Sequence, residues 1–148
     1  MLQGKINIPN CHPIDNTGQD GSKDFPLVLS CMNGDIYNYK SIIEEKEKEL
    51  NYKFNDDFST DCQALSISLT NIDFKSEAFT HIMSQNQGSY AIALQSSIHP
   101  GEIHLVKKGK QGLYVGVSYD QIMFASDVYG LIESCRYFIS VGTEQTLC

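Results

Sequence analysis

The residues with the clearest chemical potential are Asn33 and Gly34, which follow the apolar run at 27–32. An asparagine side-chain amide and a neighbouring backbone N–H can point at the same oxygen atom, as an oxyanion hole requires. Asn-Gly is also a common turn pair, and local chemistry alone favours the turn. Only the surroundings of the pair can decide between a turn and a catalytic element.

Asp61 is a second candidate, because a carboxylate at this position can either bind a cation or cap a helix. It follows Ser59-Thr60 and precedes the apolar residues Ala64 and Leu65. This pattern is typical of a helix N-terminus, so the residues alone favour a cap.

The five cysteines are widely spaced and include no Cys-x-x-Cys pair. This pattern argues against a disulfide framework or a structural zinc site and favours a reducing cytosol. Cys11 precedes His12, but neighbours in an extended segment point to opposite faces and cannot form a nucleophile–base pair directly. Cys31 and Cys62 are expected to fill the core. No metal-ligand spacing involves the remaining histidines, which we expect on loops and on the surface: His81, His99 and His104.

Length and charge limit the possible functions. The chain has 148 residues, enough for one domain with a substantial core, and a formal net charge of −7. This charge disfavours nucleic acid as a partner. No apolar run is long enough to span a bilayer, and residues 1–6 do not resemble a signal peptide. We therefore expect a cytoplasmic protein with no membrane partner.

Hydrophobic periodicity predicts helices in the first part of the chain and strands in the second. The run at 27–32 indicates a buried strand, and Asp35 is expected to cap a helix that ends near Leu50. Further helices are predicted from 60–61 onward and over 76–85. Strands are predicted at 90–94, 102–106, 113–117 and 122–125, followed by a short helix at 127–134 and a strand at 137–141. Short connections predict antiparallel neighbours, and the pattern indicates a layered α+β domain.

Read in order, these motifs resemble the glutamine-hydrolysing domain of class II (N-terminal-nucleophile) glutamine amidotransferases. The preferred branch is the glutaminase domain of glutamine–fructose-6-phosphate aminotransferases. The resemblance covers essentially the whole chain, residues 1–148. The matching segments are Gly4-Lys5, Asn10-Cys11-His12-Pro13, Asn33 to Tyr39, Ser59-Thr60-Asp61, Gly88 to Ala91, His99-Pro100, Phe124 to Asp127 and Arg136 to Ile139. Met32 departs from the histidine often found before Asn-Gly in that branch.

The resemblance implies roles for four residues. Asn33 and Gly34 match the oxyanion-hole pair, Asp61 matches the carboxylate that holds the α-ammonium of glutamine, and His12 matches a histidine near the mouth of the site. It also implies an N-terminal-nucleophile hydrolase-like αββα sandwich of four layers with mainly antiparallel sheets. No cofactor and no metal are implied.

The resemblance further implies that the chain is a partial domain. The family nucleophile is an N-terminal cysteine, and no residue of this chain matches it. The isolated chain is therefore expected to be inactive. A sandwich cut at an internal strand leaves unpaired edge backbone and exposed apolar surface, so the chain is also expected to be marginally stable or oligomeric. The parent enzyme would hydrolyse glutamine and pass ammonia to an acceptor such as fructose 6-phosphate, bound by a sugar-phosphate isomerase-type domain. Two alternatives stay open: a degenerate glutamine-binding or interaction module of the same fold, and a fragment of an asparagine synthetase.

Overall fold

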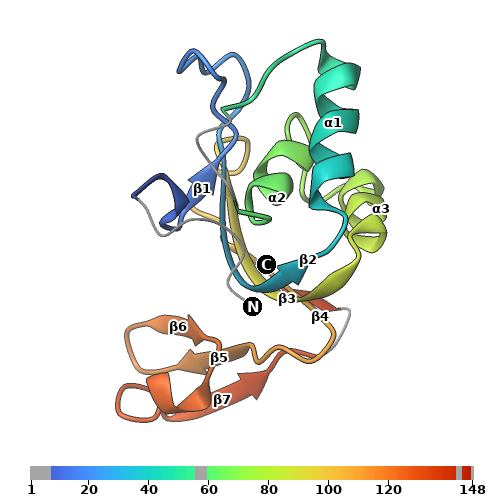
Figure 1. Cartoon of the computed structure of the whole chain (residues 1–148). Helices are drawn as coiled ribbons and strands as arrows, with labels where there is room; N and C mark the ends of the chain where they lie inside the picture. The colour runs from blue at the N-terminus through green and yellow to red at the C-terminus, as the bar shows by residue number, and fades with distance from the viewer. Residues whose placement is uncertain (1–7, 56–59, 143–144, 148) are drawn as a thin grey trace.

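The computed structural model describes residues 8–55, 60–142 and 145–147, and its largest element is a five-stranded antiparallel sheet. The strand order is β1-β2-β3-β4-β8. The strands are β1 (Ile14–Asp15), β2 (Val28–Ile36), β3 (Gly88–Ser96), β4 (His104–Lys108) and β8 (Gln145–Leu147). Three helices lie over one face of this sheet: α1 (Tyr39–Leu50), α2 (Gln63–Ser68) and α3 (Glu77–Gln85) (Figure 1). Two short 3-10 helices are η1 (Ile8–Asn10) and η2 (Val128–Gly130).

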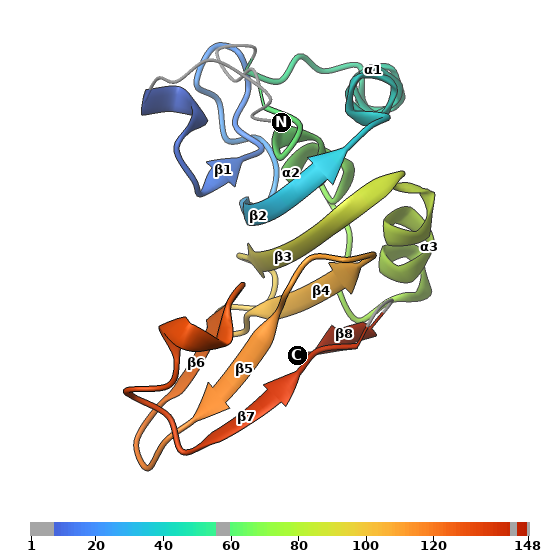
Figure 2. The same cartoon turned by 60° about the horizontal axis from the view of Figure 1, so that its bottom comes forward.

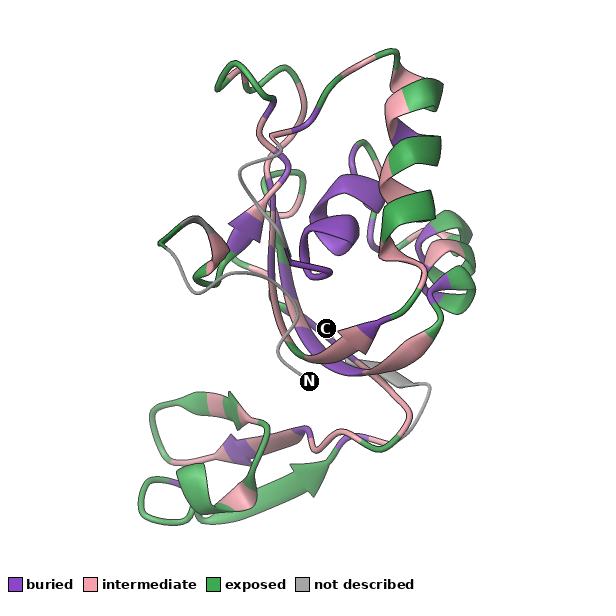
Figure 3. Cartoon of the chain, in the orientation of Figure 1, coloured by how far each residue is buried: buried purple, intermediate pink, exposed green. Residues whose placement is uncertain are grey.

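Side chains alternate between the two faces along β2 and β3, and those on the face turned toward the helices form the main core. Tyr90, Ile92 and Leu94 of β3 point toward the helices and are almost fully buried. The short helix α2 lies at the centre and is buried along its whole length (Figure 3). A hydrogen bond of 2.7 Å between Ser30 Oγ and Ser66 Oγ ties α2 to β2. The face of β2 and β3 that is turned away from the helices packs against a second layer.

That second layer is a three-stranded antiparallel sheet of order β6-β5-β7. Its strands are β5 (Tyr114–Val117), β6 (Ile122–Ala125) and β7 (Tyr137–Ser140). It lies on the side of the large sheet that faces away from the helices (Figures 1 and 2). A small cluster of buried residues joins the two sheets: Ala91, Leu105, Leu113 and Val141. The fold class is α+β with antiparallel sheets, as the sequence predicted.

Three expected elements match the structure closely. Helix α3 lies within the predicted range, and Ser76 caps it by accepting a hydrogen bond of 3.4 Å from Phe79 N–H. The segment 90–94 lies within β3, and 122–125 is β6. These segments have strong local signals, namely a capping residue or a short β-rich apolar run between turn residues.

The helix expected from Asp35 begins later than predicted. β2 continues through Ile36, and α1 begins at Tyr39. Asp35 is a strand residue opposite Ser89 and caps no helix. The second helix also begins later, at Gln63 after the N-cap position Cys62. In β2, nine paired positions with β3 override the local turn and helix signals.

The strand pairing also differs from a simple meander. β4 and β5 belong to different sheets, and β7 pairs with β5 instead of its predecessor β6. The expected strand at 102–106 begins at His104, because Glu102 lies in the loop between β3 and β4. The short helix expected at 127–134 is a 3-10 turn over Val128–Gly130, followed by further turns.

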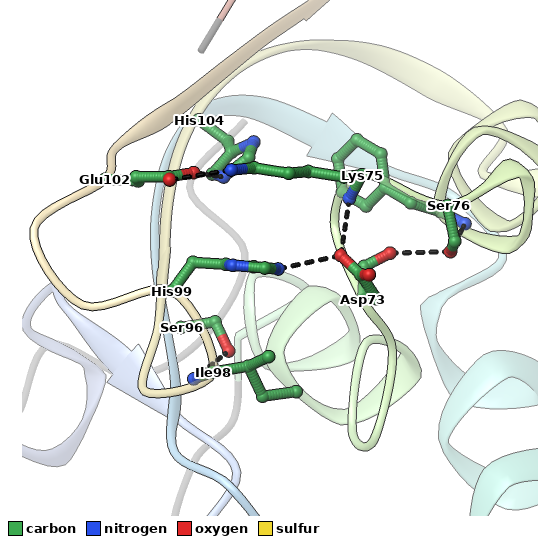
Figure 4. A network of polar contacts seen from close by, with 9 residues as sticks. Asp73, Lys75, Ser76, Ser96, Ile98, His99, Glu102 and His104 are labelled. Atoms are coloured by element: carbon green, nitrogen blue, oxygen red, sulfur yellow. Dashed lines mark hydrogen bonds and ion pairs between the residues drawn. The ribbon is translucent and has the colours of Figure 1, made fainter.

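The expectation that His104 is a surface residue is wrong. His104 is 2% exposed and packs edge-on against Phe74, with 5.1 Å between ring centroids. Figure 4 shows the surrounding network, in which Glu102 approaches both His104 and Lys75. His99 pairs with Asp73 at 2.7 Å, while His81 is exposed on α3 as expected of a surface residue. An alternating strand pattern with a histidine on the inner face would have indicated this burial.

None of the described helices is both long enough and apolar enough to cross a membrane.

Candidate functional site

The candidate site lies along the edge of β2 that β1 covers only in part. β1 pairs with β2 at Leu29 and Ser30, and the chain just before β1 continues along the same edge. In an antiparallel pair, alternate N–H groups of a strand point to the same edge. The even-numbered N–H groups of β2 therefore point away from β3, toward this partly covered edge.

Three of these edge N–H groups donate hydrogen bonds to side chains. Val28 N–H donates to Asn16 Oδ1 at 3.0 Å, before the stretch covered by β1. Beyond β1, Met32 N–H donates to His12 Nδ1 at 3.4 Å. Ile36 N–H donates to Asp61 Oδ2 at 2.6 Å. His12 and Asp61 therefore hold the strand edge two residues before and two residues after Gly34.

The Gly34 N–H points to the same edge by the same alternation. Within the described part of the chain, no side-chain acceptor is bonded to this N–H. Gly34 lies opposite Tyr90 with φ +135°, a conformation that favours glycine. A Cβ atom here would lie 2.2 Å from the carbonyl oxygen of Ser89. A glycine is thus needed for β2 to pass this close to the β3 backbone.

Asn33 is an exposed residue paired with Ala91 of β3, on the face of β2 that is turned toward the small sheet. It lines a hollow of about 200 Å³ between the two sheets. The hollow is lined by His12, Cys31, Met32, Asn33, Ala91, Ile92, Ala93, Leu113, Phe124, Ala125 and Ser126. The lining contains no lysine or arginine, and its polar side chains include an amide, an imidazole and a hydroxyl.

Asp61 is 4% exposed and lies in the turn before α2. Burial raises the pKa of this carboxyl above its usual value, and the hydrogen bond from Ile36 N–H opposes the rise. Its carboxylate receives an N–H from the end of β2, and the N-cap position of α2 is Cys62. The capping role that local pattern favoured for Asp61 is therefore not what the structure shows.

His12 has an environment that favours the neutral imidazole. Burial lowers the pKa of His12, and the negative charge of Asp61 partly offsets this. His12 and Asp61 thus influence each other although they are far apart in the sequence. The structure places all four sequence-predicted site residues along one short stretch of β2.

The cysteines near this site are not activated thiols. Burial raises the pKa of Cys31 above its usual value and raises the pKa of Cys62 to about 12. Cys62 fills the core as expected, but Cys31 is only half-buried and lines the hollow. Cys11 is exposed. Among the residues described, no group of three or more His, Cys, Asp or Glu side chains is placed to hold a metal ion.

These environments predict an order of thiol reactivity. Iodoacetamide at pH 7 is expected to modify exposed Cys11 first, Cys31 at least about tenfold more slowly, and Cys62 only after unfolding, because the thiolate is the reactive form. Peptide mass spectrometry over time measures the three rates, and the urea-unfolded chain is the control in which the differences should vanish. Rapid modification of Cys31 in the folded chain would contradict the prediction and indicate an activated thiol.

Two features of the site were missed by the residue-by-residue reasoning. The contact between Asp61 and Ile36 N–H joins segments 25 residues apart and has no local signal. The contribution of Ala125 and Ser126 to the hollow depends on how the two sheets pack. In the sequence, the Phe124 to Asp127 motif indicates only the family pattern.

Comparison with known proteins gives a family match over most of the chain. A family model described as a glutamine amidotransferase domain matches residues 19–133. This range contains Asn33, Gly34 and Asp61, whereas His12 precedes it. Two curated relatives are glutamine–fructose-6-phosphate aminotransferases [isomerizing]. The protein of Bacteroides thetaiotaomicron is 29% identical over 104 residues, which cover 68% of this chain and 17% of the relative. The protein of Methanosarcina acetivorans is 26% identical over 152 residues, covering 97% of this chain and 24% of the relative.

Solved structures share the fold. Glutamine phosphoribosylpyrophosphate amidotransferase from B. subtilis, complexed with ADP and GMP, superposes with a TM-score of 0.72 at 15% identity, covering 96% of this chain and 30% of that one. A structure described as the allosteric regulatory enzyme of purine biosynthesis gives a TM-score of 0.69 at 16% identity, with coverages of 95% and 29%. The chain thus spans less than a third of the length of each of these relatives.

Proposed function

Because this chain belongs to the glutamine amidotransferase domain family, we propose that it forms the glutamine-binding and oxyanion-stabilising part of a glutaminase site. In this proposal the Asn33 side-chain amide and the Gly34 N–H donate hydrogen bonds to the oxygen of the substrate carboxamide. Asp61 binds the α-ammonium group, and His12 lies beside the bound substrate.

The reaction would be acyl transfer. A nucleophile from outside the described residues attacks the carboxamide carbon, and negative charge develops on the carboxamide oxygen. Each preorganised donor to such an oxyanion contributes about 3 kcal/mol to the transition state. Loss of ammonia leaves an acyl intermediate, which water converts to glutamate.

The observation that carries the proposal is the position of the Gly34 N–H. It lies on the strand edge between two N–H groups that His12 and Asp61 occupy. Asn33, which immediately precedes Gly34 in the sequence, lines the adjoining hollow and offers a side-chain amide donor there. The negatively charged Asp61 near one end of this edge suits an ammonium group, whereas the edge itself offers neutral donors to the amide.

For the whole protein we propose a cytoplasmic aminotransferase that includes this domain. The two curated relatives are named for transfer to fructose 6-phosphate, so a sugar phosphate that yields glucosamine 6-phosphate is the proposed acceptor. A sugar-phosphate isomerase-type domain would bind it. The exposed apolar side chains of the small sheet, including Ile122, Tyr137 and Ile139, favour contact with a further segment or with a second copy.

A second candidate function is a non-catalytic glutamine-binding module. The raised pKa values of Cys31 and Cys62 favour it, because neither thiol near the candidate site is suited to act as a nucleophile. In that case the same donors and the same carboxylate would bind glutamine without hydrolysing it.

Titration with L-glutamine tests both functions. In ¹⁵N-labelled protein, L-glutamine at millimolar concentration is expected to shift the Gly34 N–H and Asn33 amide signals, whereas D-glutamine at equal concentration should not. Glutamate release is measured in the same samples. Binding without release from the chain alone supports the module or a partial site that needs a nucleophile. If L-glutamine leaves both signals unchanged up to tens of millimolar, the proposed function is wrong.

A further inference from the structure

His12 lies just before the start of β1 and takes up the edge of β2 that β1 does not cover. Its Nδ1 atom accepts the hydrogen bond from Met32 N–H. A ring nitrogen that accepts a hydrogen bond carries no proton, so the neutral imidazole keeps its proton on Nε2. The β2 backbone thereby selects one of the two histidine tautomers.

Within the described part of the chain, no positively charged side chain lines the hollow beside His12. The hollow that His12 lines has no lysine or arginine in its described lining, and the charged side chain that acts on the His12 imidazole is Asp61. An anionic ligand group in this hollow would meet the negative charge of Asp61, and no lysine or arginine of the described lining would compensate it. A neutral group that accepts hydrogen bonds carries no such penalty.

We propose that His12 is a specificity-determining hydrogen-bond donor, whose Nε2–H favours the uncharged carboxamide of the substrate over the carboxylate of the product. This inference rests on the proposed function. A neutral donor satisfies a carboxamide oxygen, whereas a buried carboxylate would need a charged partner. Hydrolysis converts the favoured group into the disfavoured one, which promotes release of the product.

The tautomer can be measured without any ligand. A long-range ¹H–¹⁵N correlation spectrum at pH 7.5 distinguishes Nε2–H, Nδ1–H and doubly protonated imidazoles. The His12 signals are identified by their loss in His12→Gln, and His81→Gln is the control that removes an exposed histidine instead. We expect the Nε2–H pattern for His12. The Nδ1–H or the doubly protonated pattern would overturn the inference, whatever the outcome with glutamine.

Binding measurements test the specificity. Wild-type protein is expected to bind L-glutamine at least about tenfold more tightly than L-glutamate. His12→Gln keeps a neutral donor and should stay within about threefold of wild type, whereas His12→Phe should lose about five- to tenfold in glutamine affinity. His12→Lys adds a cation and should lower the preference for glutamine over glutamate by about tenfold.

The outcomes separate the two proposals. An unchanged preference in both His12→Phe and His12→Lys, with folding verified by circular dichroism, would overturn the role of His12. If wild-type protein binds neither amino acid, the proposed function fails. The tautomer spectrum still tests whether the hydrogen bond from Met32 N–H fixes the proton of His12 on Nε2.

Discussion

Gly34→Ala is expected to cost about 3 kcal/mol or more of folding free energy and to abolish glutamine binding. The new Cβ atom would lie 2.2 Å from the carbonyl oxygen of Ser89 and 2.6 Å from the Cα of Tyr90. Both are backbone atoms of the neighbouring strand, so relief requires opening the β2–β3 pair. The φ of +135° adds strain for any residue with a side chain. Urea unfolding followed by circular dichroism measures the loss.

Gly101→Ala is the matched control for this prediction. Gly101 also has a positive φ, of 86°, but no heavy atom other than those of its own chain neighbours lies within 4 Å of a Cβ built there. Its substitution is expected to cost about 1–2 kcal/mol, from the left-handed conformation alone, and to leave glutamine binding unchanged. If Gly34→Ala is no more destabilising than Gly101→Ala, the close approach of β3 to Gly34 is not a constraint on the fold.

Asp61→Asn is expected to weaken glutamine binding by at least about 30-fold, which corresponds to the roughly 2–5 kcal/mol lost when one partner of a buried charge pair is removed. The same change should not destabilise the fold at pH 7. An asparagine oxygen can still accept the hydrogen bond from Ile36 N–H. The substitution also removes a buried carboxylate, and burial disfavours the ionised form of that group.

The pH dependence of stability distinguishes a specific loss of glutamine binding in Asp61→Asn from a general loss of folding stability. The folded-state pKa of Asp61 is raised above its ordinary value of 3.8, so the folded protein binds the proton more tightly than the unfolded chain does. The contribution of this group to stability therefore falls as pH rises from 3.8 through the folded-state pKa. Asp61→Asn should remove this loss, and the variant should unfold at an equal or higher urea concentration than wild type at pH 7.

Asp73→Asn provides the opposite control. The backbone N–H of Lys75 and the imidazole of His99 lower the pKa of Asp73, which is an exposed carboxylate that does not line the candidate site. Its stabilising contribution is present above pH 3.8 and is lost as pH falls through the folded-state pKa. Asp73→Asn should leave glutamine binding unchanged. Weak binding by Asp73→Asn, or unaffected binding by Asp61→Asn, would contradict the proposed role of Asp61.

The sequence alone predicted the elements with strong local signals. Ser76 and the apolar positions after it indicated α3, and β-rich runs between turn residues indicated β3 and β6. The ordered motifs indicated the family, which the match over residues 19–133 confirms. Those motifs also marked Asn33, Gly34 and Asp61, because local residue type and order along the chain are properties of the sequence itself.

The tertiary structure decided how these residues meet. Asn33-Gly34 has the local signal of a turn before a helix, yet pairing with β3 draws it into a nine-residue strand, because ladder hydrogen bonds and buried side chains outweigh local preference. His104 is similarly buried by packing against Phe74. Only the fold brings His12 and Asp61 to the same strand edge on either side of Gly34. Residue types determined which groups are present, and long-range pairing determined that the Gly34 N–H lies between them with no side-chain acceptor among the described residues.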